Sequence, residues 1–233
     1  MDSIKRQARI AGLLYLLVVI TGPFILIYVP NHIFVPGDAT ATVNNILAHQ
    51  TLYRASIAAG IFGDVLFMFV VLALYRLLKP VDQTLAVLMA ALILVIMPLA
   101  FLGIANQLAT LQVLRDNGNF LKVFDKPQRD ALSALLITFD MKGILVSEVF
   151  WGLWLLPLGM LVYRSRFLPR FLGVWLFLNG IAYVVVSMVG IFDPEHMRIV
   201  NKIATPVFFG EMVLMLWLVI FGARAPRGVV AAG

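Results

Sequence analysis

The charged residues of this chain bracket six long stretches that are almost free of charge. Three of the stretches contain no charged residue, and each of the other three contains a single acid. A helix that crosses a bilayer needs about 20 consecutive apolar residues, and every stretch is long enough for one such helix. The pattern predicts six transmembrane helices, over residues 10–29, 55–75, 85–105, 143–163, 171–191 and 203–223.

The composition excludes a soluble protein. Hydrophobic residues make up 62% of the 233 positions, and charged residues make up only 13%. Soluble domains are about 45–50% apolar and about 25% charged, so a chain of this composition cannot hide its apolar surface from water. The absence of cysteine excludes disulfides and thiolate metal sites. The predicted fold class is an all-α polytopic membrane protein, with residues 1–233 forming one transmembrane domain.

The net charge of +6 comes from basic residues at the ends of the apolar stretches. They do not form the clustered basic face of a nucleic-acid-binding protein, so the expected partner is the lipid bilayer and no nucleic acid. With the N-terminus inside, the inner side holds ten basic residues against two acids, and the outer side holds eight against seven. The positive-inside rule then predicts that both termini are cytoplasmic. The inner basic residues are Lys5, Arg6, Arg9, Arg76, Lys79, Arg164, Arg166, Arg170, Arg224 and Arg227.

Short amphipathic helices are predicted in the outer loops. Asp38 or Thr40 has the right chemistry to cap the first one. Asp125 and Gln128 have the spacing of a capping box, which predicts the start of a second helix. We expect this second helix to lie on the outer membrane surface and to run into the fourth span. Its apolar residues at helical spacing are Leu132, Leu135, Leu136 and Phe139.

Three carboxylates lie inside the predicted spans: Asp64, Glu148 and Glu211. Counted at about 1.5 Å per helical residue, they lie roughly 15, 9 and 13 Å from the outer ends of their spans. An acid at the centre of a membrane costs on the order of 3 kcal/mol and usually faces the interior of a helix bundle or a wet cavity. The three acids are therefore the candidate functional site. A purely structural role, as protonated groups bonded to other helices, is the alternative interpretation.

Other polar residues can complete an outward-facing pocket. Asp64 follows Ser56 and Gly60 at four-residue spacing, so one face of its helix is small and polar. Asn179 reaches a similar depth in the fifth span and can bond a carboxyl group. Two further candidates line the outer end of the third span, namely Asn106 and Gln107.

Enzyme motifs are missing from the sequence. The three histidines fall in predicted outer loops, and none has the spacing of a zinc motif. There is no G-x-S-x-G motif, no phosphate-binding glycine loop and no cysteine nucleophile. We therefore expect no catalytic residue, metal or cofactor.

Several short motifs are shared with one known family. They are Arg9–Tyr15, Val35–Ala41 with Asn44–Leu47, Tyr75-Arg76 with Lys79-Pro80, Tyr163–Ser165 with Phe167–Arg170, and Leu172-Gly173. Together they resemble the bacterial membrane family known as domain of unknown function 4386, over most of the chain to about the fifth span. Many members have a His-Asp pair before the fourth span, where this chain has Phe139-Asp140. The resemblance implies a bacterial cytoplasmic membrane protein and no particular activity.

Three functional hypotheses follow. The leading one is a protein that binds or moves a small solute or ion through the polar cavity, with Asp64 and Glu211 as proton or cation carriers. The second is a sensor, assembly factor or accessory subunit that transports nothing, in which the acids only hold helices together. The third is an intramembrane enzyme that modifies lipids.

Overall fold

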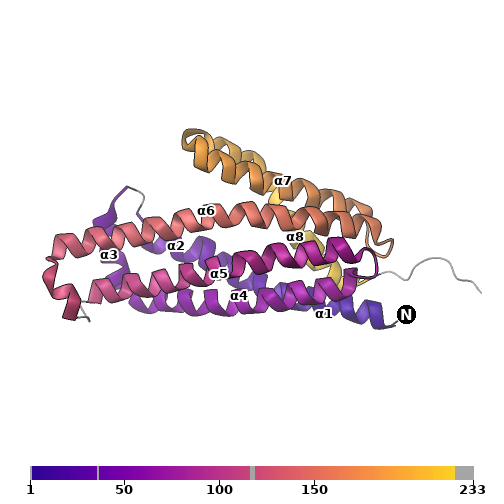
Figure 1. Cartoon of the computed structure of the whole chain (residues 1–233), viewed down its shortest axis with the longest axis horizontal. Helices are drawn as coiled ribbons and strands as arrows, with labels where there is room; N and C mark the ends of the chain where they lie inside the picture. Colours follow the sequence, from indigo (N-terminus) through magenta and orange to yellow (C-terminus); the bar gives the residue numbers. More distant parts are fainter. Residues whose placement is uncertain (1, 36, 116–118, 224–233) are drawn as a thin grey trace, which may run out of the picture. The chain divides into compact units, whose positions relative to one another are not determined.

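The computed structural model describes residues 2–35, 37–115 and 119–223, and this described part is helical, without strands. Figure 1 shows its helices and short helical turns. In chain order they are α1 (Asp2–Pro23), the π-helical segment η1 (Phe24–Tyr28), α2 (Val29–Ile33), α3 (Ala39–Ala48), α4 (Gln50–Leu78), α5 (Gln83–Arg115), η2 (Asn119–Val123), α6 (Lys126–Arg164), α7 (Arg170–Phe192), η3 (Pro194–His196) and α8 (Met197–Ile220).

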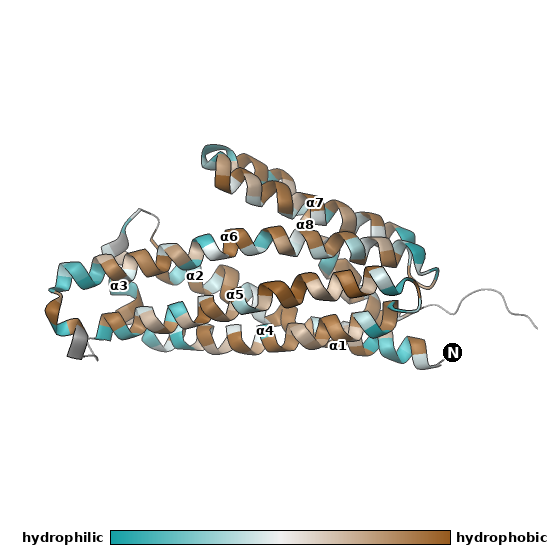
Figure 2. Ribbon diagram, in the orientation of Figure 1, coloured by the Kyte–Doolittle hydropathy of each residue, from teal (hydrophilic) through white to brown (hydrophobic). Residues whose placement is uncertain are grey.

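Within the described residues, six helical stretches are long and apolar enough to cross a membrane, which confirms the all-α, six-helix prediction. Figure 2 shows hydrophobic residues along these helices and hydrophilic residues gathered near many of their ends. The stretches are Ser3–Ile33, Gln50–Leu78, Gln83–Arg115, Lys126–Arg164, Arg170–Phe192 and Pro194–Ile220. The side of the membrane on which each end lies stays a prediction, and Arg224 and Arg227 fall outside the described residues.

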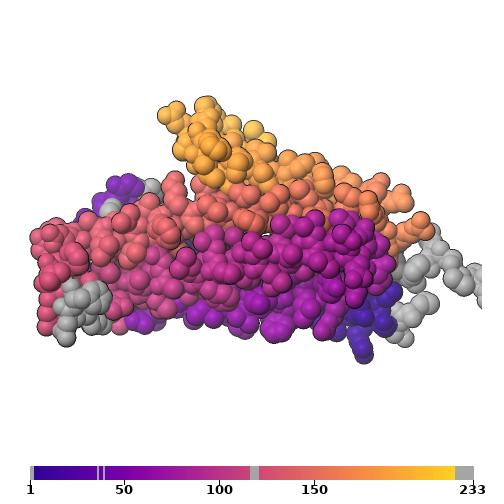
Figure 3. Space-filling view, in the orientation of Figure 1, coloured from indigo at the N-terminus to yellow at the C-terminus, as the bar shows by residue number. Residues whose placement is uncertain are grey.

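Many large apolar side chains lie on the outside of these helices. Val95 is 62% exposed, Leu135 is 64% exposed and Ile203 is 70% exposed. In the space-filling view of Figure 3, side chains of α5 (purple to magenta) form part of the visible face. Such a surface would be costly in water, whereas in a bilayer the lipid chains cover it.

Local sequence signals explain where several helices begin. The Asp38 side chain accepts a hydrogen bond of 2.8 Å from the Ala41 backbone N–H and thereby caps α3. At the start of α6, the Gln128 N–H donates to Asp125 and the Asp125 N–H donates to Gln128, at 2.9 Å each. This reciprocal pair is the predicted capping box.

The first membrane helix changes its winding at a proline. The π-helical segment η1 begins directly after Pro23, whose missing N–H removes one bond of the regular helix. The helical path nevertheless continues through α2 to Ile33. As a result His32, predicted to be in a loop, lies in a helix, where its Nδ1 is 2.7 Å from the Tyr28 carbonyl oxygen.

The chain consists of two compact units, and several long helices contribute to both. Of the described residues, the first unit contains 2–17, 66–96 and 145–223, and the second contains 18–35, 37–65, 97–115 and 119–144. The second unit has an apolar core from α2, α3, α4, α5 and α6. Its buried members are Val29, Ile33, Ile46, Tyr53, Ile57, Ile104, Leu111 and Ile137.

In the second unit, the residues that α6 buries are not the four that the sequence placed on its apolar face. The first part of this helix buries Ser133 and Ile137. Leu135 and Phe139, which the sequence placed on the apolar face, are both more than half exposed. A helix surrounded by lipid is apolar on its outer side too, so hydrophobicity alone does not identify its packed face.

In the first unit, α6 and α7 pack through glycines. A methyl group added at Gly152 would lie 2.5 Å from the Gly180 carbonyl oxygen, and one added at Gly159 would lie 2.7 Å from that of Gly173. Both neighbours are backbone atoms, so the two helices are in direct main-chain contact. Small residues permit this close approach in membrane helices, and it fixes how α7 presents its polar side chains.

Candidate functional site

The first unit holds a polar cluster centred on Glu211 of α8. The hydroxyl of Tyr15, a buried residue of α1, donates a hydrogen bond to Oε2 of Glu211. Glu211 itself is only partly exposed. The bond joins residues that are 196 positions apart in the chain, so it links the first and last membrane helices.

Tyr183 of α7 brings the second acid into this cluster. Its phenol lies within electrostatic range of both Glu211 and Glu148, and also of Tyr15. The Tyr183 ring stacks on Phe208 of α8, with ring centres 4.4 Å apart, and meets the edge of Trp151 of α6 at 6.1 Å. Among the described residues no hydrogen bond joins Tyr183 to either acid, so the interaction is electrostatic only. Aromatic contacts from both flanking helices hold the tyrosine in place.

Four polar side chains of α7 follow one another at four-residue spacing. Trp175 donates to the Val207 carbonyl at 3.0 Å, Asn179 reaches the Phe208 carbonyl at 3.5 Å, and Ser187 donates to the Leu145 carbonyl at 2.6 Å. Tyr183 occupies the remaining position. Residues four apart lie on the same helix face, so α7 presents a continuous polar stripe to α6 and α8.

Two oxygen atoms of this region are buried without a hydrogen-bond partner in the described part of the chain. They are Oε2 of Glu148 and Oδ1 of Asn179. A buried polar atom without a partner is costly, and native proteins keep few of them. Each of these two oxygens can accept a hydrogen bond or coordinate a small cation.

Within the described residues, neither Glu148 nor Glu211 forms an ion pair with a Lys, Arg or His side chain. A bare negative charge inside a membrane carries a high free-energy cost. Two acids in one cluster must therefore be neutralised by protons or by a bound cation. The described residues contain no group of three or more His, Cys, Asp or Glu arranged to hold a metal ion.

In the second unit, two polar residues of α5 form hydrogen bonds to α6. Asn106 of α5 donates to the Leu136 carbonyl of α6 at 2.6 Å, and Gln107 donates to Oδ2 of Asp140 at 2.9 Å. The sequence placed Asp140 outside the membrane segment, before residue 143, but it lies within the unbroken helix α6. Such hydrogen bonds between helices are typical of polar residues that hold a membrane bundle together.

Asp64 also belongs to the second unit, and its environment is different. No hydrogen bond or ion pair to Asp64 is found among the residues that the structure describes. One turn earlier, Gly60 faces Ile104 of α5, and the neighbouring Gly63 faces the hydroxyl of Thr21. Asp64 is partly exposed. Because it is partly exposed and has no bonding partner among the described residues, it remains a candidate carrier of a proton or cation.

Sequence reasoning identified Glu148, Glu211 and Asn179 but not the two tyrosines. Tyr183 lies one helical turn after Asn179, so a search for polar stripes along each span would have found it. Tyr15 offers no comparable local signal, because its role depends on a helix at the other end of the chain.

The six long apolar helices of the described residues define a multi-pass, membrane-type helical protein. The family model described as "Domain of unknown function (DUF4386)" matches residues 10–222, so the chain belongs to this family, as its motifs indicated. An "Uncharacterized protein" of Archaeoglobus fulgidus is 26% identical over 155 residues, which cover 66% of this chain and 76% of the relative. No solved structure matches the chain.

Proposed function

We propose that this protein binds and moves a proton or a small cation across a membrane through the cluster of Glu148, Tyr183, Glu211 and Tyr15. The observation that carries the proposal is that Glu211 accepts a hydrogen bond from Tyr15, while neither Glu211 nor Glu148 has a basic partner among the described residues. A phenol both donates and accepts hydrogen bonds, so Tyr15 can relay a proton to or from Glu211, to which it is bonded. Chains of protonatable groups of this kind are typical of pumps and transporters.

The test is proton flux into liposomes that contain the purified protein and a pH-sensitive dye. Under an imposed membrane potential, wild-type protein should acidify the lumen faster than protein-free liposomes do. Glu211→Gln and Glu148→Gln should each lower the flux to the protein-free rate, because glutamine keeps the shape of the side chain but does not exchange a proton. The same assay with a sodium gradient and a sodium-sensitive dye distinguishes a proton from a metal cation.

Glu195→Gln is the matched control, since it makes the same chemical change at an exposed residue of η3. It should retain wild-type flux. Asp64→Asn is measured separately, to test whether the candidate carrier of the second unit contributes to the flux. Wild-type flux in both cluster variants would contradict the proposal and favour the second hypothesis, in which the acids only join helices.

We further propose that the protein lies in the cytoplasmic membrane of a bacterium, with both termini in the cytoplasm. The support is the excess of basic residues on one set of helix ends. Reporter domains inserted between Arg164 and Arg170, or fused after Arg227, should be active in the cytoplasm. A reporter inserted at Asp193 should be active outside, and an external C-terminal reporter would contradict the predicted topology.

A further inference from the structure

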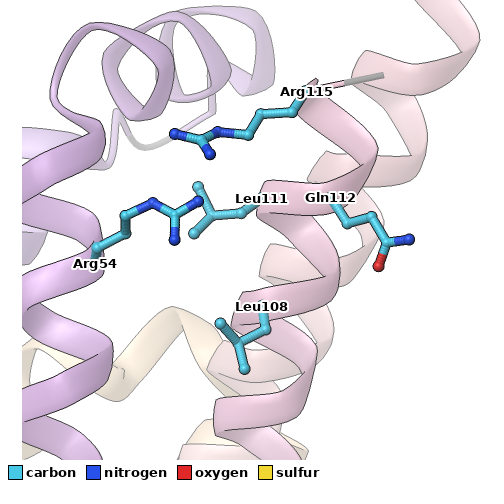
Figure 4. Close-up of a pocket in the computed structure, with 5 residues that line it drawn as sticks. All are labelled: Arg54, Leu108, Leu111, Gln112 and Arg115. Atoms are coloured by element: carbon cyan, nitrogen blue, oxygen red, sulfur yellow. The ribbon is translucent and has the colours of Figure 1, made fainter. Parts of the chain in front are cut away.

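A pocket of about 270 Å³ lies between α4 and α5 in the second unit. The described residues that line it are Arg54, Leu108, Leu111, Gln112 and Arg115. Figure 4 shows the guanidinium groups of Arg54 and Arg115 extending from the two helices into the space between them, while the Gln112 amide points away. No carboxylate is among these lining residues, so two like charges share one pocket.

The arginine of α5 is held in position by a neighbour on α4. Nε of Arg115 donates to Oε1 of Gln50 at 2.8 Å, and its Nη2 contacts the same oxygen. A guanidinium has five N–H donors, so Arg115 still has donors free after both contacts. No ion pair is found for Arg54 among the described residues. Two arginines in this arrangement match the oxygens of a phosphate group, which arginine binds in bidentate fashion.

The pocket changes from charged to apolar along α5. Leu111 lies about one helical turn before Arg115, and Leu108 lies about two turns before it, roughly 10 Å along the helix. Leu108 is 47% exposed. Both arginines flank predicted spans at their outer ends, where lipid headgroups lie. Leu111 is buried in the core of the unit, so Leu108 is the apolar side chain that a ligand can reach. A ligand with an anionic phosphate and an apolar chain fits this gradient, whereas a soluble phosphate would leave Leu108 without a contact.

We infer that this pocket binds the phosphate headgroup of an anionic phospholipid, with an acyl chain lying along the exposed side chain of Leu108. Native mass spectrometry of the purified protein titrated with phosphatidylglycerol measures this binding. The double variant Arg54→Gln, Arg115→Gln should bind the lipid about tenfold more weakly or worse, because it loses charge-assisted hydrogen bonds. Both arginines are exposed, so the variant should keep the wild-type melting temperature.

The matched control is the double variant Arg198→Gln, Lys202→Gln, which removes two exposed positive charges from the same predicted membrane side. It should keep its affinity for phosphatidylglycerol within twofold of wild type. A soluble competitor, glycerol phosphate, should not displace the lipid even in large excess. An unchanged affinity in the pocket variant, an equal loss in the control, or displacement by glycerol phosphate would each overturn the inference.

Discussion

Gly152→Ala should destabilise the protein by about 1–3 kcal/mol, which is the usual cost of overpacking a tight interface. The added methyl group would lie 2.5 Å from the Gly180 carbonyl oxygen and 2.7 Å from the Val184 side chain. A backbone oxygen cannot turn aside as a flexible side chain can, so α6 and α7 must move apart. The separation would also weaken the contacts of the polar stripe on α7. Unfolding in mixed micelles of increasing SDS content, followed by tryptophan fluorescence, measures the loss.

Gly143→Ala is the control in the same helix. Apart from the adjoining backbone of α6 itself, nothing lies within 4 Å of a methyl group added at Gly143, and alanine is favoured over glycine in a helix by about 1 kcal/mol. This variant should therefore be as stable as wild type or slightly more stable. Equal stability of the Gly143 and Gly152 variants would contradict the close contact between α6 and α7.

The hydrogen bond between Tyr15 and Glu211 should appear as a coupling free energy of about 0.6–2 kcal/mol in a double-mutant cycle. The cycle compares Tyr15→Phe, Glu211→Leu and the double variant in the same unfolding assay. It is needed because Glu211→Leu alone combines two opposite effects. The substitution removes the cost of an acid in the membrane, but it leaves the buried Tyr15 hydroxyl without its acceptor.

The control cycle pairs Glu211→Leu with Tyr75→Phe. Tyr75 interacts instead with Lys79, whose Nζ lies 5.8 Å from the ring centre. The effects of these two substitutions should add within about 0.5 kcal/mol. A coupling in the Tyr15 cycle no larger than that in the control cycle would mean that the Tyr15–Glu211 bond does not link α1 to α8.

Part of the candidate site was predictable from the sequence because an acid within an apolar run is unusual wherever that run lies. Glu148 and Glu211 were predicted on this ground, and both lie in the first unit, within electrostatic range of Tyr183. Sequence reasoning also selected Asn106 and Gln107, but it missed their partners on α6, Leu136 and Asp140. The partners depend on the rotation of each helix about its own axis, and a uniformly apolar sequence contains little information on that rotation.

The sequence by itself determined the features that depend on neighbouring residues. Six helices follow from six apolar runs, because a backbone in lipid must satisfy its hydrogen bonds internally. The caps at Asp38 and Asp125 follow from side chains that reach N–H groups three residues away.

Only the tertiary structure decided which distant residues meet. The chain has 17 glycines, and nothing local distinguishes Gly152 and Gly180, which form a main-chain contact, from Gly143, which faces open space. Likewise, the pairing of Tyr15 with Glu211 requires the first and last membrane helices to be neighbours. Helices in a bilayer can pack in many orders with similar apolar burial, so close packing and a few polar contacts select among the arrangements.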